Sequence, residues 1–427
     1  MHDEGGPGRE WIGRRRAPGR FPVWWLVAAV AAVVILGAAV AVYAATSGRR
    51  SGTAALSPGP SGSSTQSASR SPSPGTSPAP DACVASTVAA MPIEAQAGQL
   101  LMIGTPVGDP TSIADEVRAY RLGGVFLAGR GSPSAAALAQ TVRQLQDAAL
   151  AGPGIRLHIA LDQEGGQVQT LRGPDFPAFP SAVEQGQWSQ PTLQARTVDW
   201  AQRLARAGIT MDLAPVADTV PAGTAGQNPP IGAFDRQYGS DPGAVAQDVG
   251  TVVTAVQSTG VVTTLKHFPG LGRVRANTDT STGAVDRTAT VDDPYLQPFA
   301  SGIRAGSAAV MISSASYPQL DSSSIAAFSE PIVTGLLRQR LGFTGVVLSD
   351  DLGPAVAVQS VPLGERAVRF VRAGGDVVLS VRSADAGPMA GALVAAARAS
   401  AAFAARVADA AAHVLRSKVR AGLLTCH

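Results

Sequence analysis

Residues 261–281 read VVTTLKHFPGLGRVRANTDTS, and the rest of the chain is organised around this stretch. Its apolar, β-branched start, Val261–Leu265, predicts a strand that ends in two side chains able to hold a ligand, Lys266 and His267. A Pro-Gly turn and a polar loop follow. Barrel enzymes place reactive residues at such strand ends, next to a loop. The stretch therefore predicts one strand of an enzyme's barrel.

Short β-rich runs recur between longer helical segments. Eight are predicted as strands: Leu100–Gly104, Gly124–Ala128, Leu157–Asp162, Ile209–Ala214, Val261–Lys266, Ala308–Ser313, Gly345–Asp350 and Asp376–Val381. Helical spacing is found in Ala135–Leu150, Thr192–Ala207, Pro242–Ser258, Ile332–Leu341 and Leu363–Ala373. This alternation favours an α/β fold, a (β/α)8 barrel with a parallel inner sheet. A doubly wound open sheet is the alternative, but no Gly-x-Gly-x-x-Gly follows the first strand.

The N-terminal part of the chain differs in composition from the rest. Residues 1–20 are rich in Gly, Arg and Pro, and residues 21–46 contain an uncharged apolar run long enough to cross a bilayer. Because the denser Arg cluster precedes this run, we expect a cytoplasmic tail (1–20), a single-pass membrane anchor (21–46) and an extracytoplasmic remainder. Residues 47–81 are mostly Ser, Pro, Gly, Thr and Ala, which predicts a disordered linker. Cleavage near Ala44 is the alternative, and it would release a secreted protein.

The folded part is expected to be one domain, residues 82–427, because no second low-complexity segment follows. The two cysteines of the chain, Cys83 and Cys426, lie at its two ends. In an oxidising, extracytoplasmic setting this placement predicts one disulfide that joins the ends of the domain. Two unpaired thiols are the alternative.

The charge of the chain is concentrated in its N-terminal tail. The whole chain carries +3 and residues 1–50 carry +4, while Arg70 and Asp81 cancel, so residues 82–427 carry about −1. A weakly acidic domain lacks the basic surface that nucleic-acid binding requires. We therefore expect no nucleic-acid partner.

Ionisable residues gather at the carboxyl ends of the predicted strands. Asp162 ends the third strand, Lys266 and His267 follow the fifth, and Asp350 and Asp351 lie at the end of the seventh. In a barrel these positions face one mouth, where ligands bind. One Asp of the last pair could instead cap the next helix.

Two carboxylates and a base-like group around one pocket fit hydrolysis of a glycosidic bond. Of the five histidines only His158 and His267 lie at predicted strands, and no His and Cys spacing typical of a zinc site occurs. We expect no metal and no organic cofactor. The chain has no Gly-x-Ser-x-Gly, which weakens an esterase interpretation.

Six segments, in this order, resemble glycoside hydrolase family 3, and most closely its single-barrel bacterial β-N-acetylglucosaminidases. They are QLLMIG (99–104), DQEGG (162–166), APVAD (214–218), DRQY (235–238), KHFPG (266–270) and GFTGVVLSDDL (342–352). The resemblance implies a carbohydrate substrate and a retaining mechanism, with Asp350 as the nucleophile that forms a covalent glycosyl intermediate. It also implies that four residues hold the sugar hydroxyls: Asp162, Arg236, Lys266 and His267.

The chain departs from the family pattern in the loop after KHFPG. There the family has His-Gly and later Asp-Ser-His, whose last His is the general acid/base. In this chain Leu271 stands at the first His, Asn277 at the Asp and Asp279 at the catalytic His. Thr170 stands at a substrate-binding Arg, with Arg172 close by.

Three functions follow from this departure. The favoured interpretation is a retaining β-glycosidase, a β-N-acetylhexosaminidase acting on peptidoglycan-derived glycans, in which Asp279 is the acid/base with a raised pKa. A second is an enzyme that depends on an external anion or an activated leaving group. The third is a catalytically silent barrel that binds glycan or a partner at the cell surface.

Overall fold

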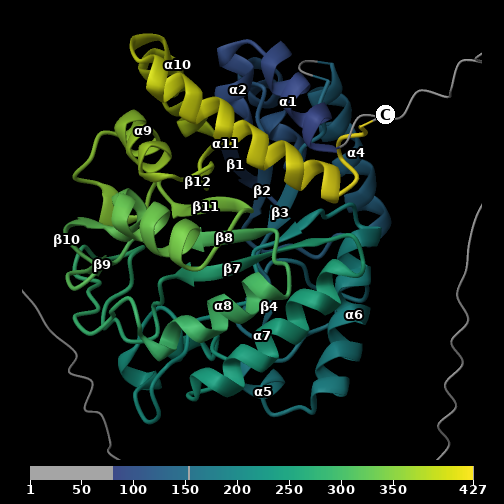
Figure 1. The fold of residues 1–427 in the computed structure, drawn as a ribbon. Helices are drawn as coiled ribbons and strands as arrows, with labels where there is room; N and C mark the ends of the chain where they lie inside the picture. The colour runs from purple at the N-terminus through teal and green to yellow at the C-terminus, as the bar shows by residue number, and fades with distance from the viewer. Residues whose placement is uncertain (1–79, 152–153, 427) are drawn as a thin grey trace, which may run out of the picture. The chain divides into compact units, whose positions relative to one another are not determined.

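Eight parallel strands close into a barrel in the computed structural model, which describes residues 80–151 and 154–426 (Figure 1). The order of the strands round the barrel is their order along the chain, and each pairs in parallel with its neighbours. They are β1 (Leu101–Pro106), β2 (Gly124–Ala128), β3 (His158–Leu161), β6 (Met211–Asp212), β7 (Val262–Phe268), β8 (Ala309–Ile312), β11 (Val346–Asp351) and β12 (Val377–Ser380). All eight predicted strands are present, so the predicted (β/α)8 barrel is confirmed.

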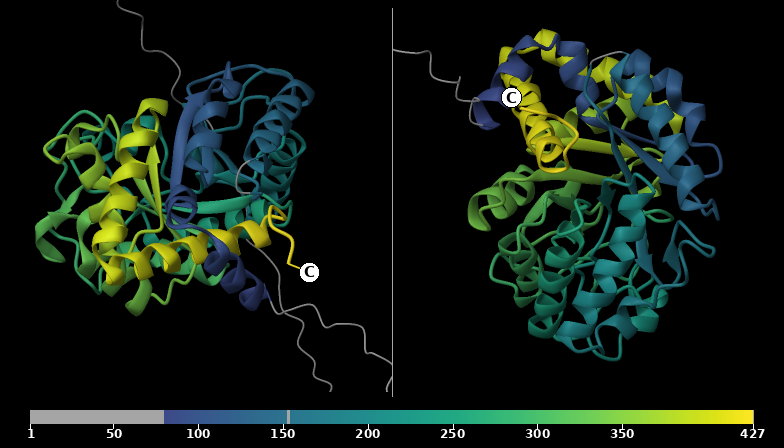
Figure 2. Two further views of the ribbon diagram at one scale, coloured as in Figure 1. Left: turned by 90° about the horizontal axis from the view of Figure 1, so that it is seen from above. Right: turned by 90° about the vertical axis from the view of Figure 1, so that its right-hand side faces the viewer.

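Helices cover the outside of the barrel and connect its strands (Figures 1 and 2). The α-helices are α1 (Pro80–Ala90), α2 (Ile93–Gln99), α3 (Ala114–Tyr120), α4 (Ala135–Leu150), α5 (Ala182–Gln185), α6 (Gln190–Arg206), α7 (Pro242–Gln257), α8 (Gln297–Arg304), α9 (Leu363–Ala373), α10 (Ala386–Ala399) and α11 (Ala401–Arg420). Side-chain caps start the longer ones, because Ser134, Ser189 and Asp241 each accept a backbone N–H of the first turn. The predicted helix Ile332–Leu341 is a π-helix, η6 (Pro331–Arg340).

Two short hairpins lie outside the barrel, β4 (Gln163–Gly165) with β5 (Val168–Gln169) and β9 (Ser316–Tyr317) with β10 (Asp321–Ile325). The barrel interior is filled with apolar side chains, among them Met102, Phe126, Met211, Met311, Leu348 and Leu379. A second apolar layer lies between strands and helices. The barrel is therefore a packed core, and polar chemistry is left to its ends.

The predicted tail (1–20), membrane anchor (21–46) and most of the predicted linker (47–81) lie outside the described residues. Within residues 80–151 and 154–426 no helix combines the length and the hydropathy that crossing a bilayer requires. Helix α1 begins at Pro80, slightly before the predicted start of the domain at residue 82.

The two ends of the domain meet at α1 and α11, which lie against each other (Figures 1 and 2). Cys83 and Cys426 form a disulfide there, with a Cα–Cα distance of 5.7 Å, so the predicted pairing is confirmed. Helix α11 closes the N-terminal end of the barrel: Ser417 Oγ lies 3.1 Å from His158 Nε2, and Lys418 Nζ donates to Gln99 Oε1 at 2.5 Å. The open mouth is consequently at the other end.

Lys418 is fully buried in this closure. No carboxylate pairs with it in the described part of the chain. Burial lowers the pKa of Lys418 from 10.5 to about 7. Between those two values the unfolded chain binds a proton that the folded chain does not, so the Lys418 contribution favours folding more as pH rises from about 7 to 10.5.

Lys418→Met should therefore raise the free energy of unfolding at pH 6 by about 1–4 kcal/mol, since it removes a buried charge without an opposite partner. The gain should shrink as the pH approaches 10. Urea unfolding with the disulfide intact, at pH 6 and pH 9.5, measures both values. The exposed Arg416 of the same helix provides the control, because Arg416→Met removes a charge from the surface. A variant less stable than the wild type at pH 6 would contradict the prediction.

Candidate active site

The carboxyl ends of the barrel strands surround a pocket of about 310 Å³. Six residues with a predicted catalytic or sugar-binding role line it: Asp162, Arg236, Lys266, His267, Asp279 and Asp350. They lie directly after β3, in β7 and β11, and in the two loops that follow β6 and β7. The structure thus brings together residues that lie up to 188 positions apart in the sequence, from Asp162 to Asp350.

Arg172 is not among the residues that line this pocket. Its side chain is exposed, and its Nε donates to the carbonyl of Gln169 at 3.3 Å. Thr170 is buried, and its N–H donates to the carbonyl of Asp162 at 3.0 Å. This loop therefore supports the strand end at Asp162, and the structure does not bring Arg172 to the pocket.

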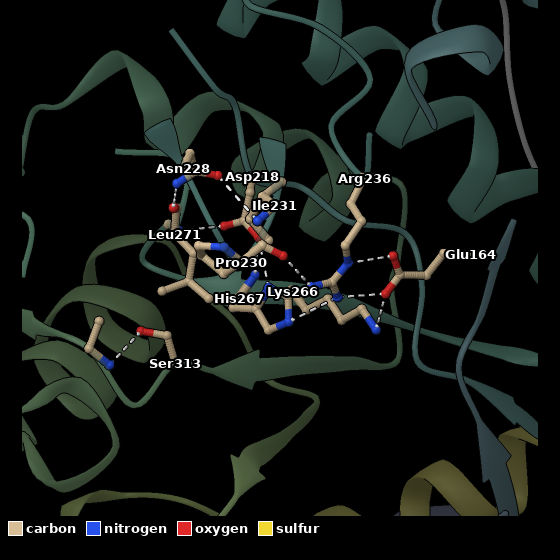
Figure 3. A network of polar contacts seen from close by, with 12 residues as sticks. Glu164, Asp218, Asn228, Pro230, Ile231, Arg236, Lys266, His267, Leu271 and Ser313 are labelled. Atoms are coloured by element: carbon tan, nitrogen blue, oxygen red, sulfur yellow. Dashed lines mark hydrogen bonds and ion pairs between the residues drawn. The ribbon is translucent and has the colours of Figure 1, made fainter. Parts of the chain in front are cut away.

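An array of four charges forms one wall of the site, and Figure 3 labels three of its members, Arg236, Glu164 and Lys266. Lys266 Nζ lies 2.5 Å from both Asp162 Oδ1 and Glu164 Oε1. Arg236 binds Glu164 through two parallel hydrogen bonds, from Nε to Oε2 at 2.8 Å and from Nη2 to Oε1 at 2.7 Å. Two cations and two carboxylates compensate each other, and the two-bond geometry holds the guanidinium in one orientation.

Burial alone would raise the pKa of Glu164, but the positive charges of Arg236 and Lys266 outweigh it and lower that pKa to about 2. Burial alone would lower the pKa of Lys266. The negative charges of Asp162 and Glu164 outweigh this effect and raise that pKa. Lys266 is therefore an ammonium group with its position determined by two carboxylates. Asp162 keeps part of its carboxylate open, with 30% of its side chain exposed.

His267 is oriented by a carboxylate that lies fully inside the protein, Asp218 (Figure 3). His267 Nδ1 lies 2.7 Å from Asp218 Oδ2, and the backbone N–H of Leu271 donates to Asp218 Oδ1 at 2.6 Å. Because a carboxylate accepts at Nδ1, that nitrogen carries a proton. His267 Nε2 faces the site instead, 3.5 Å from Arg236 Nη2.

Asn228 joins the two loops that bear Arg236 and Asp279 (Figure 3). Its Nδ2 donates to the carbonyls of Leu271 at 2.7 Å and Val274 at 2.8 Å. Its Oδ1 accepts the N–H of Gly232 at 2.7 Å. The side chain is buried, and its amide thus replaces the backbone pairing that loops lack.

Asp279 lines the pocket from the loop after β7 and is partly open to solvent. The carbonyl of Asp279 accepts the N–H of Val356 at 3.1 Å, and its own N–H donates to Asn277 Oδ1 at 2.9 Å. The surrounding protein, and next the charge of Asp350, raise the pKa of Asp279 to about 6. His267 and Arg236 act in the opposite direction. Asp279 therefore holds its proton to much higher pH than an ordinary Asp.

Asp350 and Asp351 end β11 with distinct partners. Asp350 Oδ1 accepts the N–H of Asp351 at 2.9 Å. Asp351 Oδ1 accepts the N–H of Gly353 at 2.9 Å and that of Val381 at 3.3 Å, which joins β11 to the end of β12. Burial, and secondarily the charge of Asp350, raise the pKa of Asp351 to about 6.

Four polar residues of the site escaped the sequence reasoning: Glu164, Asp218, Asn228 and Asp212. Glu164 and Asp218 belong to the segments 162–166 and 214–218, and the position of these segments after predicted strands could have marked both residues as part of the site. Asp212 lies in β6, where it accepts the N–H of Gln163 at 3.1 Å, and burial raises its pKa to about 7. Asn228 lies in an irregular loop and gave no signal.

Metal binding requires several convergent ligands. Among residues 80–151 and 154–426, no three His, Cys, Asp or Glu side chains are grouped in a way that could hold an ion.

Comparison with known proteins matches residues 92–417 to the glycosyl hydrolase family 3 N terminal domain. A beta-hexosaminidase of Mycobacterium tuberculosis, LpqI, is 32% identical over 367 residues, which cover 82% of this chain and 87% of that protein. The crystal structure of a beta-N-acetylhexosaminidase from Beutenbergia cavernae superposes with a TM-score of 0.75 at 45% identity, covering 77% of this chain and 99% of that one. A family 3 beta-N-acetylglucosaminidase from Paenibacillus gives a TM-score of 0.71 at 28% identity over 78% and 63% of the two chains.

Proposed function

Because this chain belongs to glycosyl hydrolase family 3 and is similar to beta-N-acetylhexosaminidases, we propose that it is a retaining β-N-acetylhexosaminidase acting on peptidoglycan-derived glycans. One observation carries the proposal. Four carboxyl groups line the pocket, among them Asp350 at the end of β11 and, on a different element, Asp279 with a pKa raised to about 6. A carboxylate and a carboxylic acid in one pocket are the two groups that retaining hydrolysis uses.

In the first step the Asp350 carboxylate attacks the anomeric carbon. The bond from that carbon to the leaving oxygen breaks, and Asp279 transfers its proton to this oxygen. In the second step ionised Asp279 takes a proton from water, whose oxygen displaces Asp350. The sugar leaves with its original anomeric configuration, and Asp279 is protonated again.

The charged wall supports a role in holding the sugar. The exposed part of the Asp162 carboxylate accepts hydrogen bonds from sugar hydroxyls, while Lys266, Arg236 and His267 Nε2 face the same pocket. Since Lys266 and Arg236 are already neutralised, they donate hydrogen bonds to a neutral sugar without leaving a charge unpaired.

We place this domain outside the cytoplasm, on the cell membrane. The Arg-rich residues 1–20 and the apolar residues 21–46 support an anchor, and the disulfide Cys83–Cys426 fits an oxidising compartment. If the N-terminal segment is cleaved, the domain is secreted.

The proposal predicts that kcat/KM for N,N′-diacetylchitobiose falls as pH rises above about 6. Only protonated Asp279 can supply the proton, and the fraction protonated decreases tenfold per unit above its pKa. Turnover measured from pH 4 to pH 9 tests this, with Asp279→Asn as the matched variant, whose low residual activity should lack that basic limb. No turnover of any β-N-acetylhexosaminide at any pH would refute the proposed function. A basic limb that persists in Asp279→Asn would assign the proton to another group.

A further inference from the structure

A hollow of about 310 Å³ lies at the N-terminal end of the barrel, opposite the candidate active site. Its lining includes residues 306–308 before β8, residues 342–346 before β11 and one face of α11, and we call it the basal hollow. Helix α11 contributes His413, Arg416 and Arg420. Among the described residues that line the basal hollow there is no Asp or Glu. The hollow is therefore basic, in a domain that carries about −1.

The two arginines of the basal hollow are open to a ligand. Arg420 is exposed and has no carboxylate partner among residues 80–151 and 154–426. Its Nη2 lies 3.5 Å from the position that a Cβ would occupy at Gly306. Arg416 Nε donates to Asp81 Oδ1 at 3.0 Å, in a pair whose side chains are 46% and 82% exposed. Ion pairs as exposed as this one contribute little, so Arg416 can exchange Asp81 for a stronger anion.

Behind His413 lies the fully buried Asp376, whose Oδ1 is 3.1 Å from His413 Nδ1. This carboxylate already has two cationic partners, Arg338 Nη2 at 2.5 Å and Arg406 Nη2 at 2.6 Å. Since these guanidinium groups compensate Asp376, its charge is not left to cancel that of the two arginines in the basal hollow.

Two backbone donors add to the basal hollow. Thr344 and Gly345 line it between η6 and β11, and their N–H groups have no acceptor in the part of the chain that the structure describes. Guanidinium groups bind phosphate through charge-assisted hydrogen bonds, and backbone N–H groups complete many phosphate sites. The basal hollow therefore offers the donors of a phosphate site.

The surroundings of the basal hollow are positive as well. Helices that connect parallel strands run opposite to them, so their C-terminal ends lie at this end of the barrel. Four of these helices have an exposed Arg in the last turn: Arg206 of α6, Arg304 of α8, Arg340 of η6 and Arg372 of α9. Arginines there offset the helix dipole, so they do not by themselves indicate a ligand. Arg416 and His413 lie before the last turn of α11, where the dipole gives no such reason.

The described chain begins at the rim of the basal hollow. Arg416 contacts Asp81 in the first turn of α1, and the disulfide Cys83–Cys426 joins the same helix to the segment after α11. The segment before residue 80, which contains the apolar run 21–46, is therefore connected to the domain beside the hollow. A membrane that holds this run is on the side of the chain's entry, within reach of the two arginines.

We propose that the basal hollow binds the phosphate group of an anionic phospholipid through Arg416, Arg420 and the N–H groups of Thr344 and Gly345. The bound headgroup holds the N-terminal end of the barrel against the membrane, and the candidate active site, at the opposite end, faces away from it. Basic surfaces are attracted to anionic bilayers over about a Debye length, which brings the positive end of the barrel to the lipid first. The inference rests on the proposed membrane location and is independent of the catalytic roles.

The test uses the full chain in lipid nanodiscs and measures hydrogen exchange of residues 341–346. Discs of phosphatidylcholine and phosphatidylglycerol in a ratio of about 2:1 are compared with discs of phosphatidylcholine alone. Exchange of this segment should be about three- to tenfold slower in the anionic discs, and Arg416→Gln combined with Arg420→Gln should abolish the difference. The matched control, Arg206→Gln combined with Arg372→Gln, removes the same charge from the same end of the barrel but outside the basal hollow. It should keep the difference.

Equal exchange of residues 341–346 in the two kinds of disc overturns the proposal. Loss of the difference in the control also overturns it, because general attraction of the positive end would then explain the effect. Inorganic phosphate at about 5 mM, added to the neutral discs, tests a soluble source of the same chemistry. Protection by this phosphate without protection by phosphatidylglycerol overturns the lipid assignment.

Thermal unfolding checks that the variants are folded. Turnover of N,N′-diacetylchitobiose separates this proposal from the proposed function, since both double variants should keep the wild-type rate. Absent turnover by the wild type would refute the catalytic proposal, whereas the exchange measurement alone decides the lipid site.

Discussion

Asp350→Ala should lower kcat/KM for 4-nitrophenyl β-N-acetylglucosaminide by about 10³–10⁵-fold, which corresponds to roughly 4–7 kcal/mol of transition-state stabilisation. In the proposed mechanism the variant loses the carboxylate that forms the covalent intermediate. Binding of the sugar should remain, because the array of Asp162, Lys266, Glu164 and Arg236 is unchanged. Steady-state kinetics and titration calorimetry with N-acetylglucosamine measure both effects.

The exposed Asp115 of α3 offers a matched control, since Asp115→Asn removes a carboxylate from the surface. Sodium azide adds a second readout to the Asp350→Ala experiment. In the space left by the side chain, azide should attack the anomeric carbon and yield a glycosyl azide of inverted configuration. Retention of more than a tenth of the activity by Asp350→Ala would exclude Asp350 as the nucleophile.

Asp279→Ala should reduce kcat/KM much more for substrates with poor leaving groups than for substrates with good ones. With chitobiose, whose leaving oxygen needs a proton, kcat/KM should fall by about 10²–10⁴-fold. With 4-nitrophenyl or 2,4-dinitrophenyl β-N-acetylglucosaminide, bond cleavage needs little acid assistance, so a much smaller loss is expected for the first step. Hydrolysis of the intermediate should become slower, since in the proposed mechanism Asp279 also activates water. A burst of nitrophenol followed by slow turnover is the expected time course.

Equal losses with good and poor leaving groups would contradict the acid/base role of Asp279. The matched variant is Asn277→Ala, which removes the acceptor of the Asp279 N–H without removing a carboxyl group. It should reduce activity less than Asp279→Ala does. A barrel that only binds glycan would leave even dinitrophenyl substrates intact, and the wild-type protein would then show no burst.

The raised pKa of Asp279 is a property of the whole site. Asp279 has protein around it and Asp350 nearby, so its charged form is disfavoured. His267 and Arg236 limit this shift and keep the pKa near 6, a value that suits the acid/base role proposed for Asp279. A His with an ordinary pKa of about 6.5 titrates in the same range.

Much of the fold could be predicted because its information is local. A strand buried on both faces reads as an apolar, β-branched run, and β2 and β11 are found within one residue of their predicted ends. Helices α4 and α9 begin and end at the predicted residues. Polar residues at the carboxyl ends of the apolar strands lie at one mouth of the barrel. Asp162, Lys266 and Asp350 could therefore be assigned to one site from the sequence.

By itself, the sequence determined the eight strands, their parallel order, the disulfide Cys83–Cys426 and the set of strand ends that carry charge. Only the tertiary structure decided which charges meet. Lys266 and Asp162 are 104 residues apart, and Arg236 and Glu164 are 72 apart. Their contacts depend on the path of loops, for which local propensity holds no information. The raised pKa of Asp279 has the same origin, because the surrounding protein atoms and the charge of Asp350 come near it only after the chain has folded.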